Sequence, residues 1–448
     1  MDTPDKQTGT SSPAHVPPGA ELRVPEGDVL DETKRSRIGI LRPLKHRDFT
    51  LLWAGMTISL LGDGIFLVAI AFQVYAISND PSALSLVFGA WTAPMVIFFL
   101  FTGVLTDRMD RRLMMIAADV LRGLSVGMMG YLSVTGTVEI SHLIVLAVIY
   151  GIGDTLFMPA FTAIVPEVVP NELLLEANSL QQFVRPLTLR MIGPATGGIL
   201  VGVFGAGTAL LVDAVSFLAS IGMVALMTSR PRMRSESDRT SAVSEIKEGL
   251  AFVKSQPWLW GTISAAALFL LAFIGPHEVL VPYLIKNDLR GDAADFGWVL
   301  LAGGAGAIVT SFAMGQRRLP QKHILFMFGT LGSSALLVAA YPFVTAVWQA
   351  AAISFTMTAL FTADMVVWGT LMHKLVPREL LGRASSIDWL VSTLFVPVSF
   401  ILTGPISKAI GVKQTMVWAG VLAASFTFLF LLVPGIRDTE RDGRLADA

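Results

Sequence analysis

The stretch GVLTDRMDRR, residues 103–112, stands where one long apolar segment ends and another begins. Its last six residues hold three arginines and two aspartates. The apolar segments on either side, near 82–106 and 113–134, carry charge only at Asp119 and Arg122. Each is long enough to cross a bilayer, for which about 20 residues are needed. A short charged loop between two such segments is typical of a protein with several membrane-spanning helices.

The composition extends this interpretation to the whole chain. Hydrophobic residues make up 53%, charged residues 15%, and the mean hydropathy is +0.64, whereas a soluble domain carries roughly a quarter charged residues. The apolar runs are continuous rather than alternating, which predicts helices and not a barrel. We therefore predict an all-α membrane protein with spans near 51–77, 82–106, 113–134, 142–164, 178–203, 207–228, 258–285, 295–315, 323–343, 346–372, 386–408 and 413–434.

Several classes of chemistry lack their residues in this sequence. The chain has no cysteine, which excludes disulfides and thiolate metal sites. Its six histidines are scattered without metal-ligand spacing. We find neither a phosphate-binding Walker loop nor a nucleophile–histidine arrangement, and the net charge of −1 gives no reason to expect nucleic acid. We therefore expect no enzymatic activity, no metal and no cofactor.

The distribution of basic residues predicts the orientation. If the N-terminus is cytoplasmic, the cytoplasmic loops and tails hold 26 Lys and Arg residues, the opposite loops hold four, and three lie inside spans. Cytoplasmic loops are generally the more basic ones. Both termini are therefore predicted to be cytoplasmic.

A repeat divides the chain into two halves. Residues 169–179 and 376–386 both read V-P-x-E-L-L-x-x-A-x-S, 207 residues apart, and each precedes an odd-numbered span. Two parallel halves of six spans follow. We predict a disordered cytoplasmic tail over 1–40, a first six-helix bundle over 41–229 and a second over 258–436. A basic cytoplasmic linker, 230–257, joins the bundles and contains a surface helix over 243–253, and a second cytoplasmic tail follows over 437–448.

The charged loop resembles the signature loop between helices two and three of the major facilitator superfamily (MFS). That pattern is roughly G-x-L-x-D-R-x-G-R-R. The resemblance implies the MFS fold of two pseudo-symmetric bundles, with a loop that latches the cytoplasmic side; a plain positive anchor is the alternative. The chain departs from the pattern at Asp110, where the family usually has Gly. The matching residues are Gly103, Leu105, Asp107, Arg108, Arg111 and Arg112.

A second motif, in span five, resembles the antiporter motif of proton-coupled drug exporters in the superfamily. Its residues are Gly193, Pro194, Gly197 and Gly198. Two upstream glycines of that motif are replaced by Leu180 and Leu189. The resemblance implies export, whereas a packing kink at the proline is the alternative. Residues 61–64, 119–122 and 212–217 are similar to the branch with macrolide efflux proteins, the enterobactin exporter and Tap-type mycobacterial pumps.

Charged residues inside spans need a reason, since each costs at least about 2.5–3.5 kcal/mol on insertion scales. The resemblance implies that spans one and four line the central cavity, which makes Asp63 and Asp154 candidate proton carriers. A carboxyl group in an apolar cavity can load and release a proton near neutral pH. The alternative is a permanent ion pair with Arg185 or Arg190 of span five.

Other polar residues inside spans have open roles. Gln181, Arg185 and Thr188 fall on one helical face, which predicts a stripe toward the cavity or interhelical hydrogen bonds. Asp119 and Arg122, one turn apart, can pair locally. His277-Glu278 is expected near the outer interface and hydrated, and Asp364 near the cytoplasmic end of span ten, in gating or simply solvated.

Together these features predict a secondary active transporter in a bacterial cytoplasmic membrane. We expect it to export amphipathic small molecules or drugs in exchange for protons, and so to confer antibiotic resistance, as a monomer with membrane lipids and a small-molecule substrate as its partners. The alternatives are a dedicated exporter of one compound such as a siderophore, a lipid-flipping or importing member of the fold, and a receptor that has lost transport.

Overall fold

The described part of the chain contains 12 helices that are long and apolar enough to cross a membrane, and this confirms the all-α prediction. The computed structural model describes residues 39–228 and 242–441, without the side chains of 99–108 and 242–246. The first six spans are α1 (Arg47–Ile77), α2 (Pro81–Arg108), α3 (Arg111–Val134), α4 (Ile140–Val168), the run of α5 (Leu174–Leu187), η4 (Thr188–Ile192) and α6 (Gly193–Phe204), and α7 (Ala206–Ala225). The last six are α9 (Pro257–Asn287), α10 (Ala293–Gly315), α11 (His323–Val338), α12 (Val347–Leu375), the pair α13 (Arg378–Leu394) and α14 (Val396–Ile410), and α15 (Val412–Phe430).

Short helices cover the segments outside the spans. They are η2 (Gly39–Lys45), η3 (Asn171–Leu173), α8 (Ala242–Ser255), η6 (Tyr341–Phe343) and α16 (Asp438–Arg441). The amphipathic stretch 243–253 lies in α8, which joins α13 through an ion pair of 2.7 Å between Glu248 and Arg383. Of the expected tails, residues 1–38 and 442–448 lie outside the described residues, as does 229–241 of the linker.

The segment predicted as a second cytoplasmic tail, 437–448, begins with the helix α16, which packs against α11. Thr439 of α16 is buried and lies 3.0 Å from Nε2 of His323, at the start of α11. The backbone N–H of Leu325 donates to the carboxylate of Glu440 at 2.9 Å. Because Glu440 satisfies a free N–H in the first turn of α11, α16 acts as a cap for that helix.

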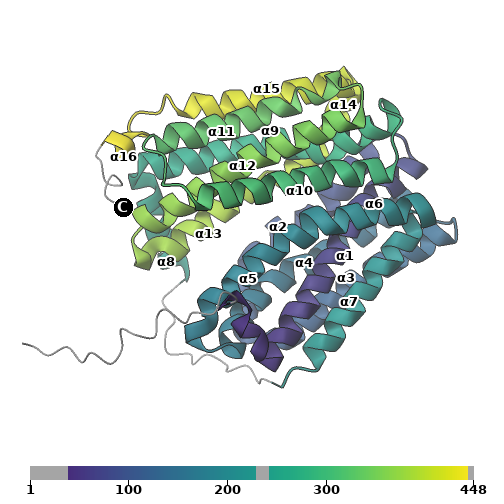
Figure 1. Cartoon of the computed structure of the whole chain (residues 1–448), viewed down its shortest axis with the longest axis horizontal. Coiled ribbons are helices and arrows are strands. Elements are labelled where there is room, and N and C mark those ends of the chain that lie inside the picture. The colour runs from purple at the N-terminus through teal and green to yellow at the C-terminus, as the bar shows by residue number, and fades with distance from the viewer. Residues whose placement is uncertain (1–38, 229–241, 442–448) are drawn as a thin grey trace, which may run out of the picture.

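The six-helix halves are joined at one end and separate at the other. Figure 1 shows α8, α16 and the start of α1 at one end, here called the terminal end, and the opposite end is called the far end. The buried apolar core at the far end draws on both halves, for example Phe88, Phe296 and Phe400. Toward the terminal end each half has its own core, one built around Phe161 and the other around Phe328. Among the described residues, the cores at the terminal end are therefore separate for the two halves.

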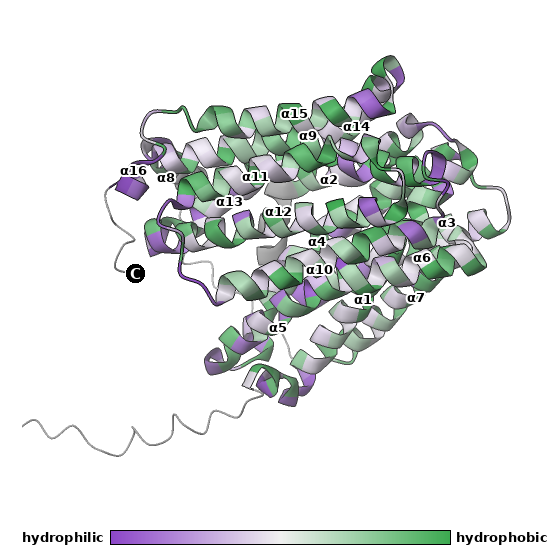
Figure 2. Cartoon of the chain, turned by 45° about the horizontal axis from the view of Figure 1, so that its top comes forward, coloured by the Kyte–Doolittle hydropathy of each residue, from purple (hydrophilic) through white to green (hydrophobic). Residues whose placement is uncertain are grey.

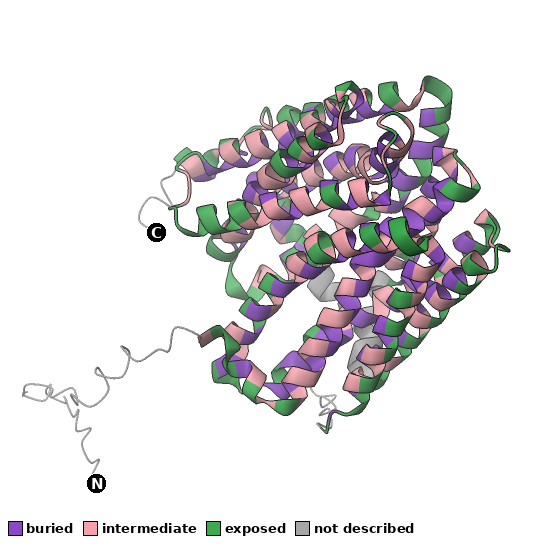
Figure 3. Ribbon diagram, turned by 45° about the vertical axis from the view of Figure 1, so that its right-hand side comes forward, coloured by how far each residue is buried: buried purple, intermediate pink, exposed green. Residues whose placement is uncertain are grey.

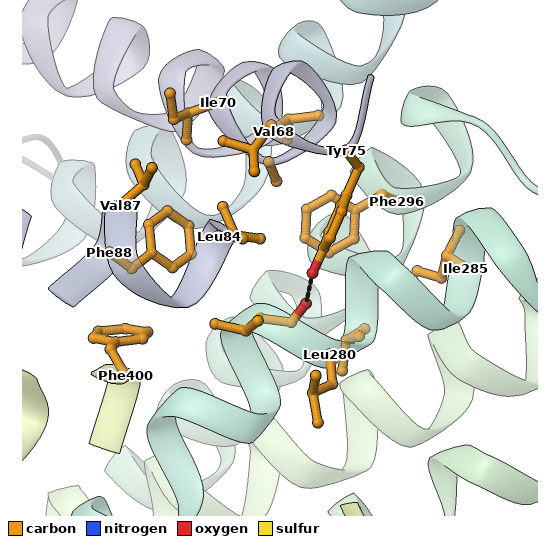
Figure 4. Close-up of a cluster of buried hydrophobic side chains, with 14 of the residues drawn as sticks. Val68, Ile70, Tyr75, Leu84, Val87, Phe88, Leu280, Ile285, Phe296 and Phe400 are labelled. Atoms are coloured by element: carbon orange, nitrogen blue, oxygen red, sulfur yellow. Dashed lines mark hydrogen bonds between the residues drawn. The ribbon is translucent and has the colours of Figure 1, made fainter. Parts of the chain in front are cut away.

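Close helix crossings and hydrogen bonds seal the far end. Helix α2 packs along α14, and α6 along α10. The hydroxyl of Tyr75 donates to the carbonyl oxygen of Val279 at 2.7 Å, beside the shared core (Figure 4). The side chains of Asn79 and Asn287 are hydrogen-bonded at 2.7 Å, and Lys286 donates to the backbone of Tyr75. These contacts join the end of α1 to the end of α9.

The outer surface has the chemistry of a lipid-facing one. Apolar residues cover the flanks of the helices, and many of them are exposed (Figures 2 and 3). Leu124 is 69% exposed and Phe312 72%. A soluble protein rarely exposes so many large apolar side chains together, so this surface is one that a bilayer would cover.

The sequence repeat occupies matching places in the two halves. Ala177 and Ala384, the ninth residue of each copy of the repeat, are both fully buried. Each span that follows ends at a glycine with positive φ, Gly205 at 82° and Gly411 at 90°. Only glycine adopts this conformation without strain. The two turns lie 206 residues apart, as pseudo-symmetric bundles require.

The far-end seal can be tested by crosslinking, since the natural chain has no cysteine. We expect the double variant Asn79→Cys/Asn287→Cys to be joined by a short bifunctional thiol reagent, because the two native side chains touch. Crosslinking is read from mobility on a denaturing gel after cleavage in the 229–241 segment. Either single variant serves as the control, and an uncrosslinked double variant would contradict this arrangement.

Candidate functional site

One buried arginine organises the N-terminal half. Arg122 of α3 is 2% exposed and lies among three carboxylates. Its Nη2 binds Asp119, one turn earlier, as the sequence predicted, while its Nη1 lies 3.7 Å from carboxylate oxygens of both Asp63 and Asp154. The group thus ties α1 and α4 to α3.

Aromatic rings complete the surroundings of the guanidinium. The centroids of Phe157 and Phe217 lie 4.3 and 4.7 Å from its central carbon, within cation–π range. The hydroxyl of Tyr150 donates to Asp63 at 2.6 Å. Arg122 therefore contacts carboxylates on one side and the faces of aromatic rings on the others.

Asp63 is placed by the glycines on either side of it. A side chain at Gly62 would collide with Asp213 and Ser216 of α7, and one at Gly64 would lie 2.8 Å from the backbone of Gly193. Helix α1 can therefore approach α6 and α7 closely at this level. Asp63 is consequently fixed at a crossing of three helices, with its carboxylate toward Arg122.

The three carboxylates differ in their access to the cavity. The side chain of Asp119 is fully buried and accepts a hydrogen bond of 2.6 Å from Ser220. Those of Asp63 and Asp154 are 14% and 41% exposed, and both line the central cavity. Asp119 is thus the structural partner of Arg122, while Asp63 and Asp154 can meet a ligand.

The central cavity lies between the two halves and has a volume of about 250 Å³. Its wall is largely apolar and aromatic, with contributions from Phe88, Trp91 and Phe157 and, across the interface, from Phe400. The charged groups of the wall are Asp63, Arg122, Asp154, Arg185, Arg190 and Glu278. Such a cavity suits an amphipathic molecule.

The alternative interpretation, in which Asp63 and Asp154 form ion pairs with span five, is wrong. Asp63 and Asp154 pair with Arg122 of α3 and not with Arg185 or Arg190. Arg185 lines the cavity and reaches the sulfur of Met158 at 3.0 Å. No carboxylate partner of Arg185 is found among the described residues. The side chain of span five that pairs with an acid is Arg190, and its partner lies in the other half.

Only one member of the predicted stripe on span five lines the cavity, namely Arg185. Thr188 is buried and its hydroxyl donates to the carbonyl of Val184, in its own helix. Gln181 is half-buried, and its amide nitrogen has no hydrogen-bond partner. The helix changes from α to π at Thr188–Ile192, so the α-helical spacing used to place Thr188 ends at Leu187.

Glu278 is not hydrated near an interface, which corrects the expectation for this residue. Its side chain is 10% exposed, and it pairs with Arg190 at 3.5 Å and with His277 at 3.6 Å. It also lines both the central cavity and a second lobe of about 280 Å³ that extends into the C-terminal half. Helix α9 bears this carboxylate on the inward face, which its depth along the helix did not reveal.

The glycine motif of span five makes the helix crossings there possible. A side chain at Gly193 would lie 2.8 Å from Gly64 of α1, and one at Gly198 would lie 2.5 Å from the carbonyl of Ala293 in α10. Gly197 likewise packs against Ile65. Pro194 opens α6 directly after the π-helical turn, where its missing N–H favours a break. The motif thus brings α6 against both halves.

The charged loop anchors helix ends within its own half. Arg111 binds Glu167 and the carbonyl of Ala163, near the end of α4. Arg112 donates to the carbonyls of Val224 and Ala225, at the end of α7. Positive charge at helix C-termini is stabilising.

Asp110, which stands where the family pattern has glycine, is the N-cap residue of α3. It accepts hydrogen bonds from the backbone of Arg112 at 2.9 Å and Leu113 at 3.3 Å, and so caps α3. The surroundings of Gly103 and the side chains of Asp107 and Arg108 are not among those that the structure describes.

Sequence reasoning missed three residues of the site. Tyr150 carries no pattern of its own among apolar neighbours, and Glu278 was assigned to the wrong environment. Arg122 was recognised only as a local partner of Asp119. A signal was available for Arg122, since ionisable residues in spans face the bundle interior and pair with one another, and Asp63 and Asp154 were the other acids at mid-span.

Comparisons with known proteins identify the family and the fold. The family of transmembrane secretion effectors matches residues 38–445. The chain is 26% identical to the multidrug efflux pump Tap of Mycolicibacterium fortuitum, over 87% of this chain and 96% of Tap. It is 23% identical to macrolide efflux protein A of Streptococcus pyogenes, over 88% and 97% of the two chains. A bacterial homologue of the iron transporter ferroportin, solved in an inward-facing state, shares the fold with a TM-score of 0.66 and 17% identity, over 86% of this chain and 98% of that one.

The role of Arg122 predicts a large loss of stability on its removal. We expect Arg122→Met to destabilise the protein by roughly 3–5 kcal/mol, because it leaves buried carboxylates without their counter-charge. Thermal unfolding of the purified protein measures the effect. Arg42→Met is the control, since Arg42 is exposed and lies 3.8 Å from Glu176, so its loss should cost about 0–1 kcal/mol.

The double variant Arg122→Met/Asp119→Leu should recover part of the stability, because it also removes the most buried of the charges left behind. An Arg122→Met protein as stable as the Arg42→Met control would contradict the central place of this guanidinium.

Proposed function

The chain belongs to the transmembrane secretion effector family of MFS transporters, and from that premise we propose that it exports amphipathic small molecules in exchange for protons by alternating access. The relatives named as efflux proteins support the direction of transport. We further propose that it acts as a monomer in a bacterial cytoplasmic membrane, with both termini in the cytoplasm and without a cofactor. The proton gradient supplies the driving force.

One observation carries the proposal: three carboxylates surround a single guanidinium in the membrane. If all three were ionised, the cluster would hold two excess negative charges in a medium where uncompensated charge is costly. A proton or a cationic ligand relieves that excess. Since Asp63 and Asp154 line the central cavity, we assign the exchange to them.

Exchange follows from competition for the same site. When the cavity faces the cytoplasm, a cationic substrate binds near Asp154 and Asp63 and its charge replaces that of a proton. When the cavity faces outward, protons from that side bind the carboxylates and the substrate leaves. The positive charge of Arg122 compensates one of the three carboxylates in every state of the transporter. The negative charge of the other two is compensated by protons in one state and by the cationic substrate in the other.

The cavity wall supports a broad choice of substrate. Aromatic and aliphatic side chains dominate it, and the second lobe shares Leu67, Ile274 and the Arg190–Glu278 pair with it. A molecule larger than either lobe can therefore reach from one into the other. Dispersion and burial supply most of the affinity in such sites, which favours shape-tolerant recognition of drugs and dyes.

The distribution of cores supports alternating access. The halves share a core at the far end and have separate cores toward the terminal end, as in a state that is open on one side. Arg190 and Glu278 are the ion pair between halves in the described part of the chain. Rocking of the halves about this level would open the far end and close the terminal one.

Dye export tests the coupling. We expect cells with the wild-type protein, in a strain lacking its own pumps, to accumulate less ethidium than cells with an empty vector. A protonophore should abolish the difference. Asp63→Asn should abolish it as well, with a loss of at least about tenfold in initial efflux rate, because a neutral amide cannot exchange a proton.

The matched control is Asp288→Asn, at an exposed acid that pairs with Lys413 at 3.1 Å away from both lobes. It makes the same chemical change and should keep wild-type efflux. Undiminished export by Asp63→Asn at equal expression would reject the assigned coupling residue, and export that survives the protonophore would reject proton exchange.

Locking the far end tests alternating access. The crosslinked Asn79→Cys/Asn287→Cys protein should lose export, since the end through which the substrate leaves cannot open, and a reagent with a reducible link should allow recovery on reduction. Efflux from proteoliposomes measures this. Full activity of the crosslinked protein would mean that the halves need not separate there.

A dedicated exporter of one anionic compound is the second candidate. It is favoured by Arg185, which lines the cavity with no carboxylate partner among the described residues. The dye experiment separates the two, because an exporter of one anion would leave ethidium accumulation unchanged.

A further inference from the structure

A third cavity, apart from the central one, lies within the C-terminal half. It is bounded by α9, α11, α12 and α13 and has a volume of about 200 Å³. In α9, α11 and α12 the residues that line it lie in the part of the helix nearer the terminal end, whereas α13 lines it with residues of its second half. Its lining includes the two acids Asp364 and Asp388 and the aromatic residues Trp368, Trp389, Phe269, Phe328 and Phe361. We refer to it as the acidic aromatic cavity.

Asp364 is the unusual member of this lining. It is only 3% exposed, so it is not solvated as one interpretation of the sequence had it. Among the described residues it has neither a hydrogen-bond nor an ion-pair partner, and its carboxylate lines the cavity. Buried acids in membrane spans are normally paired. The geometry therefore leaves room for a partner that is not part of the chain.

A second carboxylate, that of Asp388 in α13, also lines the cavity and is fixed by hydrogen bonds. Asp388 of α13 accepts hydrogen bonds from the indole N–H of Trp368 at 3.1 Å and from Ser392 at 3.3 Å. The ring of Trp368 is itself fixed against Trp258 in an edge-to-face contact at 6.0 Å. The acid and the indole are thus oriented by neighbours and not free to turn away.

From these contacts we infer that the acidic aromatic cavity binds a compact organic cation of the alkylammonium class. The lining contains two carboxylates and no Lys, Arg or His, so a bound cation would be the missing counter-charge. Indole and phenyl faces bind ammonium groups through cation–π contacts, with tryptophan the strongest. An alkylammonium group matches this combination of charge and apolar surface.

Size and ligand type narrow the class further. The cavity has a volume of about 200 Å³ and, unlike the central cavity, shares no charged residue with a neighbouring lobe into which a larger ligand could reach. A metal ion such as calcium requires about 6–8 oxygen ligands, whereas here most of the lining is apolar. A small ammonium compound satisfies both limits.

The site is distinct from the one that carries the proposed export. The acidic aromatic cavity shares only Leu270 and Phe361 with the second lobe and no residue with the central cavity. Binding there can be measured without any flux. The inference therefore stands or falls independently of proton exchange at Asp63.

Choline, a trimethylammonium compound, is the probe. We expect the purified full chain in lipid nanodiscs to bind radiolabelled choline in equilibrium dialysis, and Asp364→Asn to weaken binding about tenfold or more, the loss expected for one charge-assisted contact. Asp364→Glu, which keeps the charge, should retain most of the affinity. Trp368→Leu should also weaken binding, because it removes both the ring and the hydrogen bond to Asp388.

The matched control is Glu379→Gln on the same helix as Asp388, at an exposed position outside the cavity, and its affinity should equal that of wild type. Unfolding temperatures identify variants that fail to fold. If Asp364→Asn is one of them, the choline affinities of Asp364→Glu and Trp368→Leu are compared instead, and the inference requires that Asp364→Glu bind more tightly than Trp368→Leu. No binding to wild type, or equal binding to Asp364→Asn, overturns the inference. Displacement by the uncharged isostere of choline, or by sodium at similar concentration, overturns it too, since the site would then not select an organic cation.

Discussion

The compensation of charge by one buried guanidinium is the constraint on which the N-terminal half depends. Arg122 is surrounded by carboxylates from α1, α3 and α4 and by rings of Phe157 and Phe217. In a medium that solvates charge poorly, the helices that bear these acids cannot move away from it without exposing uncompensated charge. Three helices are thereby held as one body, while the number of acids exceeds what a single cation can neutralise.

In the same half, helices also pack closely at glycines, where backbones come into contact without any ion pair. Gly62 and Gly64 on either side of Asp63 admit α7 and α6, and Gly193 meets Gly64 at the crossing. Small residues supply contact area between helices without a hydrophobic driving force, which is weak inside a bilayer. Rigid bundles with an internal charge cluster, joined through a shared core at the far end, are what a rocking motion requires.

Much of the fold was predictable from the sequence, and the site only in part. The twelve spans follow from apolar run length, and the confirmed local pair of Asp119 and Arg122 follows from helical spacing. Asp63 and Asp154 were singled out because acids in spans are rare. Their partner was misassigned to span five, because a residue's neighbours across helices depend on rotation and depth that run length does not specify. Glu278 was misplaced for the same reason, and Thr188 because a π-helical turn altered the spacing.

By itself the sequence determined the class of protein, the number of spans, the two-fold repeat and the residues whose charge needs an explanation, since all of these depend on local composition and on the length of chain that crosses a bilayer. Only the tertiary structure decided which charges meet. It put Arg122 between Asp63 and Asp154, joined Arg190 to Glu278 across the halves, and left Asp364 facing a cavity of aromatic rings. The physical reason is that pairing in a low-dielectric interior is set by distances of a few ångströms between different helices, and those distances are fixed by packing and not by sequence separation.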